Sequence, residues 1–201
     1  MRYFIDLAYD GSAFHGWQIQ PNATSVQETI ENALAVIFQQ EMPIVGAGRT
    51  DAGVHAQQLI AHWDCKGKID VAQLQFKLNN MLPAEIAINS IYQVKEDAHA
   101  RFHAIAREYK YYVSTKKNPF QHQYSYYLKR ELNMAKMNEA ADILKKYTDF
   151  KCFSKSRTDV HTYNCKIEFA HWEVEKELLV FTIKADRFLR NMVRAIVGTL
   201  I

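Results

Sequence analysis

A glycine-rich stretch, residues 46–55, holds the side chains whose types and spacing could do chemistry. It reads Gly-Ala-Gly-Arg-Thr-Asp-Ala-Gly-Val-His and contains three of the chain's seven glycines. Glycines packed this closely indicate a backbone with positive φ angles or a close approach to another group. Asp51, held ionised by a nearby cation such as Arg49, could act there as a nucleophile or a base. The alternative is an Asx-turn in which Asp51 caps its own loop and Arg49 is solvated.

Several known site motifs are excluded for this stretch. The third glycine of a G-x-G-x-x-G dinucleotide fingerprint would fall where Asp51 stands, and no Lys-Ser/Thr pair follows to make a phosphate-binding loop. No G-x-S-x-G is present to supply a serine nucleophile. No second carboxylate lies beside Asp51, so a glycosidase pair has no local support.

The histidines and cysteines do not predict a metal site. His99 and His103 are four residues apart, as are His161 and Cys165, but neither pair has a further ligand at metal-binding spacing. The three cysteines contain no C-x-x-C, which favours reduced thiols in a cytoplasmic protein. We therefore expect no metal and no other cofactor.

The composition of the chain narrows the class of protein to which it can belong. The chain has 201 residues, of which 48% are hydrophobic and 23% charged, as expected for a globular protein. No run approaches the ~18 consecutive apolar residues of a membrane span, and Asp6 comes too early for a signal peptide. Residues 1–100 carry 6 Lys and Arg against 11 Asp and Glu, whereas residues 101–201 carry 19 against 11. The second half is therefore a candidate surface for a nucleic acid.

The helices and strands that must position Asp51 can be predicted from the periodicity of hydrophobic residues along the chain. Residues 2–9 alternate as a strand, Ser25 and Glu28 form a capping box that opens a helix, and a short strand near 43–46 runs into the glycine-rich loop. The first half continues with a strand at 56–64, a helix from Asp70 to Pro83 and a strand at 86–95. The second half is predicted to repeat the order, with a strand at 105–115, a helix at 133–147, strands at 163–175 and 177–185, and a helix from about 189.

Both halves match the split βαβ, or ferredoxin-like, pattern of an α+β protein. The predicted domains are residues 1–103, which carry the Asp51 loop, and 104–201, which are basic. The second half lacks its final strand, and apolar residues run to Ile201. We expect the chain to be an N-terminal piece of a longer protein.

Five ordered stretches resemble the tRNA pseudouridine synthase A (TruA) family. The first is the loop 48–55; the others are 9–12 with 16–18 and 25–28, 100–104 with 107–111, 149–150 with 153–154, and Phe188 with 192–194 and 196–198. Together they span the chain.

The resemblance implies both fold and activity. Family members join two ferredoxin-like halves into a continuous antiparallel sheet with the active-site cleft between them. They act as homodimers on the tRNA anticodon stem-loop at positions 38 to 40, without metal or cofactor. They break the C1′–N1 bond of uridine, turn the uracil and join C5 to C1′, which yields pseudouridine.

The resemblance also assigns roles to residues. Asp51 is implied as the catalytic aspartate, which either attacks C1′ or removes a sugar proton beside it. Tyr109 is implied to stack on the uracil, and Arg49 and Arg194 to be active-site cations. We expect Arg194 to be partly buried and paired with Asp51, because a buried guanidinium requires a carboxylate partner. Arg49 is expected closer to solvent, free to meet an RNA phosphate.

The residue types alone leave two other functions possible. A non-catalytic RNA-binding module or RNA chaperone of the same fold would share the basic second half but would not require Asp51, Arg49, Tyr109 and Arg194 together. A hydrolase that uses Asp51 on nucleosides would release free uracil.

Overall fold

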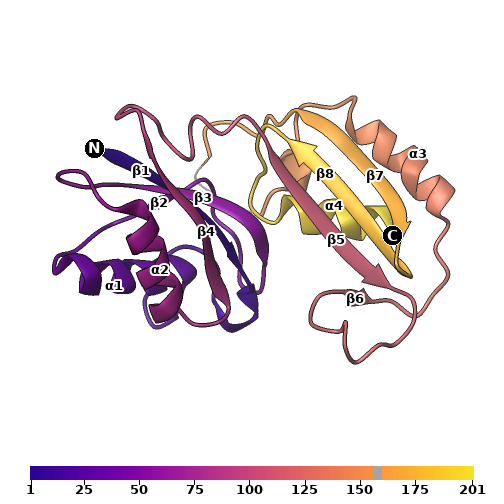
Figure 1. Cartoon of the computed structure of the whole chain (residues 1–201). Coiled ribbons are helices and arrows are strands. Elements are labelled where there is room, and N and C mark those ends of the chain that lie inside the picture. Colours follow the sequence, from indigo (N-terminus) through magenta and orange to yellow (C-terminus); the bar gives the residue numbers. More distant parts are fainter. Residues whose placement is uncertain (156–159) are drawn as a thin grey trace. The chain divides into compact units, whose positions relative to one another are not determined.

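The chain forms two compact units in its computed structural model, which describes residues 1–155 and 160–201. The units are Met1–Ala104 and Ile105–Ile201. Each has its own four-stranded sheet and its own hydrophobic core. Figure 1 colours unit 1 from indigo to magenta and unit 2 through orange to yellow. The α+β class predicted from the sequence is confirmed.

Unit 1 has the split βαβ order. Its elements are β1 Arg2–Tyr9, a short 3₁₀ turn at Gly11–Ala13, α1 Val26–Phe38, β2 Val45–Gly46, β3 Ala56–Asp64, α2 Val71–Met81 and β4 Ile86–Val94. The strands lie in the order β2-β3-β1-β4, with β1 antiparallel to both of its neighbours. Helices α1 and α2 lie together beside this sheet (Figure 1), and their buried residues share its core.

Local sequence signals explain the bounds of these elements. The predicted inner face of β1 is buried, with Tyr3, Ile5, Leu7 and Tyr9 at most 4% exposed. Helix α1 begins after Ser25, whose hydroxyl accepts the Glu28 amide at 3.2 Å, as the capping box predicts. Asp70 caps α2 in the same way. A strand of nine residues, β3, directly follows the glycine-rich loop.

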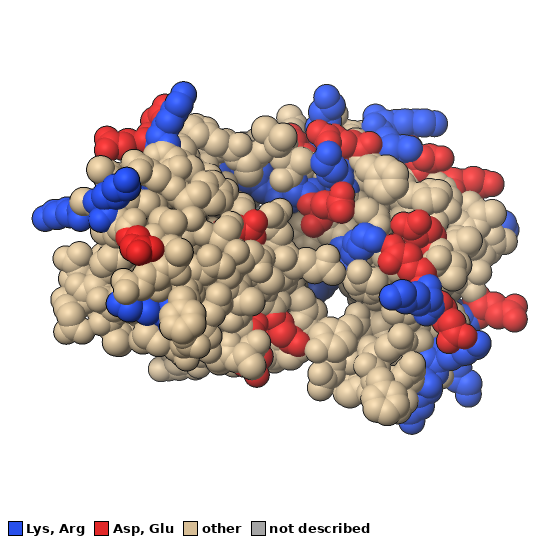
Figure 2. All heavy atoms as spheres, in the orientation of Figure 1, with Lys and Arg blue, Asp and Glu red and all other residues tan. Residues whose placement is uncertain are grey.

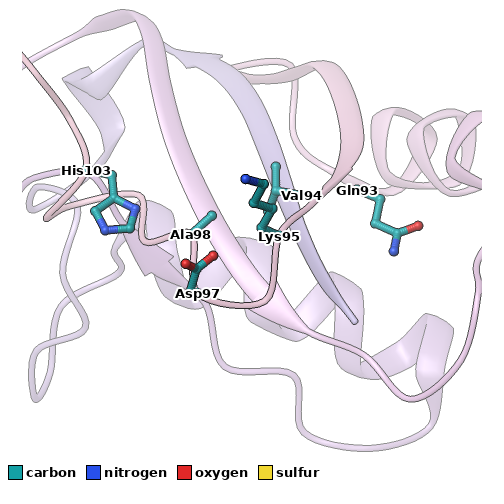
Figure 3. A pocket seen from close by; sticks show the side chains of 6 residues that line it. All are labelled: Gln93, Val94, Lys95, Asp97, Ala98 and His103. Atoms are coloured by element: carbon teal, nitrogen blue, oxygen red, sulfur yellow. The ribbon is translucent and has the colours of Figure 1, made fainter.

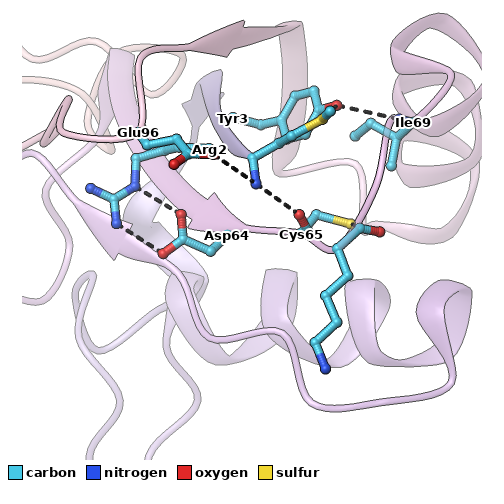
Figure 4. A network of polar contacts seen from close by, with 8 residues as sticks. Arg2, Tyr3, Asp64, Cys65, Ile69 and Glu96 are labelled. Carbon is cyan, nitrogen blue, oxygen red and sulfur yellow. Dashed lines mark hydrogen bonds and ion pairs between the residues drawn. The ribbon is translucent and has the colours of Figure 1, made fainter.

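A polar network links the strands of unit 1 at the end of the sheet where β1 begins (Figure 4). Arg2 donates from Nε and Nη2 to the two carboxylate oxygens of Asp64, at 2.9 and 2.8 Å. This paired guanidinium holds the pKa of Asp64 below its usual value. The N-terminal amine donates to the Cys65 carbonyl at 3.1 Å. The start of β1 is therefore tied to the end of β3.

A buried histidine on β3 faces this network. His62 is 4% exposed, and its Nδ1 accepts the Ala100 amide at 3.3 Å. Burial lowers the pKa of His62, and the positive charge of Arg2 acts in the same direction. In the folded unit His62 is therefore the neutral acceptor, and a proton on Nδ1 would break its bond to Ala100.

We expect unit 1 to lose stability as the pH falls through the range where His62 titrates. The unfolded chain binds this proton near pH 6.5 and the folded unit only at a lower pH. Its contribution is therefore full above about pH 6.5 and is lost on acidification. In His62→Gln the free energy of unfolding, measured in urea from pH 7.5 to 5, should fall less steeply than in the wild type. His15→Gln, at an exposed site, is the control; the same slope in all three proteins would contradict the prediction.

Unit 2 repeats the β-α-β-β-α part of this order, with one strand added after its first strand and none described after its second helix. Its elements are β5 Arg107–Ser114, β6 Tyr126–Tyr127, α3 Met134–Leu144, a 3₁₀ turn at Lys151–Phe153, β7 Ile167–Glu175, β8 Leu178–Ala185 and α4 Met192–Leu200. The strands lie in the order β6-β5-β8-β7. Both helices bury residues in one core with the sheet. Burial raises the pKa of the Cys165 thiol in this core to about 11, so it is protonated at neutral pH.

Three features of unit 2 differ from the prediction, one of which is that β7 begins at Ile167 rather than near 163. Strand β6 was not predicted, and it pairs parallel to β5, so this sheet is not wholly antiparallel. The reason is that residues 115–125 carry the chain back beside the end of β5. The last helix begins at Met192 rather than near 189, because Asn191 adopts a left-handed φ of 65°. Among the described residues of both units, no helix combines the length and the apolar character needed to cross a membrane.

Candidate active site

The glycine-rich loop of unit 1 is braced by the segment that follows β1. The Thr50 hydroxyl and the Tyr9 hydroxyl are 2.9 Å apart, and the Thr50 carbonyl accepts the Trp17 amide at 3.3 Å. On the far side of Asp51, the Gly53 amide donates to the Phe14 carbonyl at 3.4 Å. The backbone is therefore held on both flanks of Asp51.

The bracing segment approaches so closely that it requires glycine. A Cβ built on Gly16 would lie 2.3 Å from the Thr50 carbonyl oxygen, and one on Gly11 would lie 2.1 Å from the Val54 carbonyl oxygen. Gly16 also has a φ of +93°. On the loop itself, Gly46 packs against the Trp17 ring, 2.5 Å from its built Cβ. The close approach expected of this stretch is thus confirmed, and the bracing segment supplies part of it.

A histidine and a carboxylate complete the brace. His55 Nδ1 lies 3.0 Å from Asp10 Oδ1 and 3.1 Å from the Gly11 amide. One nitrogen cannot donate to the first and accept from the second at the same time. A charged His55 would pair with Asp10, whereas a neutral one would accept the Gly11 amide. Both arrangements join the end of the loop to residues 10–11.

The two candidate residues on the loop differ in exposure. Asp51 is half-buried and Arg49 is exposed. A half-buried carboxylate on a braced backbone has a defined position and still has access to a ligand. Arg49 is accessible to a phosphate, as expected.

We expect the Thr50 hydroxyl to be a positioning group for this loop. Thr50→Val keeps the shape but removes the contact to Tyr9, which should cost about 1 kcal/mol of unfolding free energy. Because Asp51 follows directly, kcat should fall about tenfold. Thr50→Ser retains the hydroxyl and is the matched control. Equal kcat values for the Val and Ser variants, measured on the RNA substrate proposed below, would contradict this role.

In unit 2, Tyr109 lies on β5 opposite Ile183 of β8. Its half-buried ring meets the Phe188 ring edge-on, with centroids 5.1 Å apart and planes at 89°. Phe188 follows a turn organised by Asp186, whose carboxylate accepts the Lys166 and Arg187 amides at 2.8 and 2.7 Å. The ring of Tyr109 is therefore fixed by packing and retains some exposure.

Arg194 is exposed on α4, which corrects the expectation of partial burial. The helix buries Met192, Ile196 and Val197, and Arg194 lies roughly 200° around the helix from Met192. Its charge acts on Tyr111 of β5: burial raises the pKa of the Tyr111 hydroxyl, and Arg194 opposes that rise. Arg194 thus stands near the β5 face that carries Tyr109 and Tyr111. The ion pair between Arg194 and Asp51 joins residues of the two units and stays a prediction.

A surface depression in unit 1 lies away from the loop. It is lined by Gln93, Val94, Lys95, Asp97, Ala98 and His103 (Figure 3). Val94 pairs with Arg2 at the start of β1, whereas the Asp51 loop is braced by Tyr9 at its end. The depression is therefore at the opposite end of the sheet. In residues 1–155 and 160–201, no group of three or more His, Cys, Asp or Glu side chains is placed to hold a metal ion.

Sequence reasoning missed the bracing groups of the site. Tyr9, Asp10, Thr50 and His55 are prominent only once the chain is folded, because their partners are more than 40 residues apart. The available signal was the coincidence of three small or polar residues, Asp10, Gly11 and Ser12, directly after a strand. Phe188 belongs to one of the stretches that carry the family resemblance, but its packing against Tyr109 was not predicted.

The class of protein is defined by its fold and site: a ferredoxin-like unit that presents an aspartate on a braced loop, followed by a second, basic α+β unit. Comparison with known families identifies it: the tRNA pseudouridine synthase family matches residues 7–103 and 146–201. The chain belongs to this family of isomerases.

Individual relatives agree. The chain is 57% identical over 201 residues to tRNA pseudouridine synthase A of Parabacteroides distasonis, covering 100% of this chain and 80% of the relative. It is 56% identical over 202 residues to the Bacteroides fragilis protein of the same name, with the same coverage. The Bacillus subtilis tRNA pseudouridine synthase A is 38% identical over 205 residues, covering 100% of this chain and 83% of the relative.

Proposed function

We propose that the chain isomerises uridine to pseudouridine in tRNA, at positions 38 to 40 of the anticodon stem-loop. The observation that carries the proposal is the half-buried Asp51, braced on both flanks and followed in the chain by a basic unit. The names of the relatives support tRNA as the substrate and pseudouridine as the product, whereas the positions rest on the family resemblance. The proposed enzyme acts in the cytoplasm as a homodimer.

The reaction is balanced within the substrate. The C1′–N1 bond breaks, the uracil turns, C5 bonds to C1′, and C5 gives up the proton that N1 gains through solvent. No electrons enter or leave, so the chemistry calls for no redox partner. Asp51 either attacks C1′, with the uracil as leaving group, or removes a sugar proton beside it.

The remaining residues assist by binding and by charge. Tyr109 offers a fixed aromatic face on which a flipped uracil can stack, which offsets part of the unstacking cost of a few kcal/mol. Arg194 is the proposed cationic partner of the Asp51 carboxylate. Arg49, exposed beside Asp51, contacts RNA phosphate.

Tritium release tests the function directly. Full-length protein and tRNA labelled with [5-³H]uridine should release tritium to water and yield pseudouridine, with EDTA present as well as absent. Substrates carrying cytidine at 38, 39 or 40 assign the position. Free uracil as the product would make the protein a nucleoside hydrolase. Tight tRNA binding without release would make it an RNA-binding module.

Arg194→Ala should show whether the charge of Arg194 matters for turnover without mattering for the stability of the fold. Because Arg194 is exposed, its removal should change the unfolding free energy by less than about 0.5 kcal/mol. Its loss as an electrostatic partner should lower kcat on the order of 10²-fold. Arg190→Ala, also exposed and four residues earlier in the chain, is the matched control. An unchanged kcat in Arg194→Ala would remove Arg194 from the catalytic set.

A further inference from the structure

The segment between β5 and α3, residues 115–130, presents large aromatic rings to solvent. It is named here the β5–α3 segment. Phe120 is 91% exposed, and Tyr124, Tyr126 and Tyr127 are 52%, 49% and 44% exposed. Exposed rings of this size, gathered in one segment, are typical of a surface that binds something.

The β5–α3 segment is built by its own hydrogen bonds. The Gln121 carbonyl accepts the Tyr124 and Ser125 amides, each at 3.0 Å, and the Ser125 hydroxyl at 2.9 Å. The Leu128 amide donates to the Ser114 carbonyl at 2.9 Å, and Leu128 packs against the core of unit 2. The rings are thus held outward on a defined backbone, so binding need not first order the segment.

The charged side chains of the segment itself are all basic. It contains Lys116, Lys117, Lys129 and Arg130 and no Asp or Glu. Just beyond the segment, the connection to α3 holds one acid, Glu131. Lys116 lies 3.9 Å from Glu177, but both side chains are about 80% exposed, so water screens this contact. Figure 2 shows several Lys and Arg side chains beside uncharged residues, with Asp or Glu side chains nearby, around the region where Figure 1 labels β6. Cations interleaved with aromatic faces match a phosphate backbone with unstacked bases.

We propose that the β5–α3 segment is an RNA-binding surface that stacks an unpaired base on Phe120 and holds the flanking phosphates with Lys117 and Lys129. A second copy of the chain fits less well, because a symmetric contact would bring two cationic segments face to face. The inference rests on the proposed function, whose anticodon stem-loop offers unpaired bases. It adds a contact apart from the residues assigned to chemistry.

Ring chemistry at position 120 tests the stacking. The affinity of each variant for a synthetic anticodon stem-loop is measured by fluorescence anisotropy. Phe120→Ala and Phe120→Leu should raise Kd about tenfold, since leucine is apolar but has no aromatic face, whereas Phe120→Trp should bind like the wild type. Phe76→Ala is the control, because Phe76 is 70% exposed on α2 of the other unit. In turnover, Phe120→Ala should raise KM and leave kcat unchanged.

Salt dependence tests the phosphate contacts. Removing Lys117 and Lys129 together should reduce the magnitude of the log Kd against log salt slope by about 1.5. The pair Lys66→Ala and Lys68→Ala, two exposed lysines of unit 1, removes the same charge and should leave the slope close to that of the wild type.

Each outcome decides one claim. Wild-type turnover with unchanged Kd and slope in the segment variants would overturn the surface and leave the proposed function standing. Absence of tritium release by the wild type would overturn the function instead. A Phe120→Ala variant that changes the mass in light scattering, while its affinity for RNA stays unchanged, would reassign the segment to contact between copies.

Discussion

Asp51→Asn is expected to abolish pseudouridine formation while the protein folds and binds tRNA as before. The amide is nearly isosteric with the carboxylate, so the braced loop keeps its shape. Asparagine carries no negative charge, so it can neither attack C1′ nor take a sugar proton. Tritium release should fall about 10⁴-fold or more. The free energy of unfolding and the Kd for tRNA, measured on the same preparation, should stay near those of the wild type.

Asp97→Asn is the matched control for that result. Asp97 is an exposed carboxylate of the same unit at the other end of the sheet, so its loss should leave turnover unchanged. Residual turnover above a hundredth of the wild type in Asp51→Asn would remove Asp51 from the chemistry.

The second large effect is expected for Gly16→Ala, in the segment that braces the loop. The new Cβ would lie 2.3 Å from the Thr50 carbonyl oxygen, a backbone atom that cannot swing away, at a φ of +93°. Strain and overlap together should cost about 3 kcal/mol of unfolding free energy. Relief of the overlap must move Thr50 and hence Asp51, which should lower kcat on the order of 10²-fold in the folded fraction.

Alanine substitutions at two glycines of the loop serve as comparisons for the stability cost expected at Gly16. Gly48 meets nothing within 4 Å and has an ordinary φ, so Gly48→Ala should change stability by less than about 0.5 kcal/mol. Gly53 also faces open space but has a φ of +74°, so its alanine variant should show the backbone cost alone, about 1 kcal/mol. A Gly16 variant no less stable than the Gly53 variant would show that the close approach carries no cost.

Much of unit 1 could be predicted because its signals are local. Strands β1 and β3 and helix α1 have the predicted positions, since alternation and a capping box depend on residues only a few positions apart. In unit 2, β6 is two residues long and depends on pairing with Val113 and Ser114. A strand that short has no periodicity, so its sequence could not predict it.

The sequence could predict which residues make up the candidate site, but not all of their burial or their hydrogen-bond partners. Glycine density singled out Asp51 and Arg49, and the family resemblance added Tyr109 and Arg194. The burial of Arg194 was wrongly predicted, because apolar neighbours along a helix do not show which face the residue itself takes. The brace on Thr50 depends on Tyr9 and Trp17, which are more than 30 residues away and carry no sign of that contact.

The bonds between residues 9–17 and 50–55 also bear on how the loop moves. Loops that present a catalytic group often open independently, with a free energy far below that of the whole domain. Here, however, the Gly16 and Trp17 carbonyls accept the Val26 and Gln27 amides at the first turn of α1, while Trp17 also holds Thr50. Opening the Asp51 loop therefore breaks contacts shared with the first turn of α1. We therefore expect the Asp51 carboxylate to move cooperatively with that turn, so that fluctuations that displace it should be about as rare as local unfolding of the helix start.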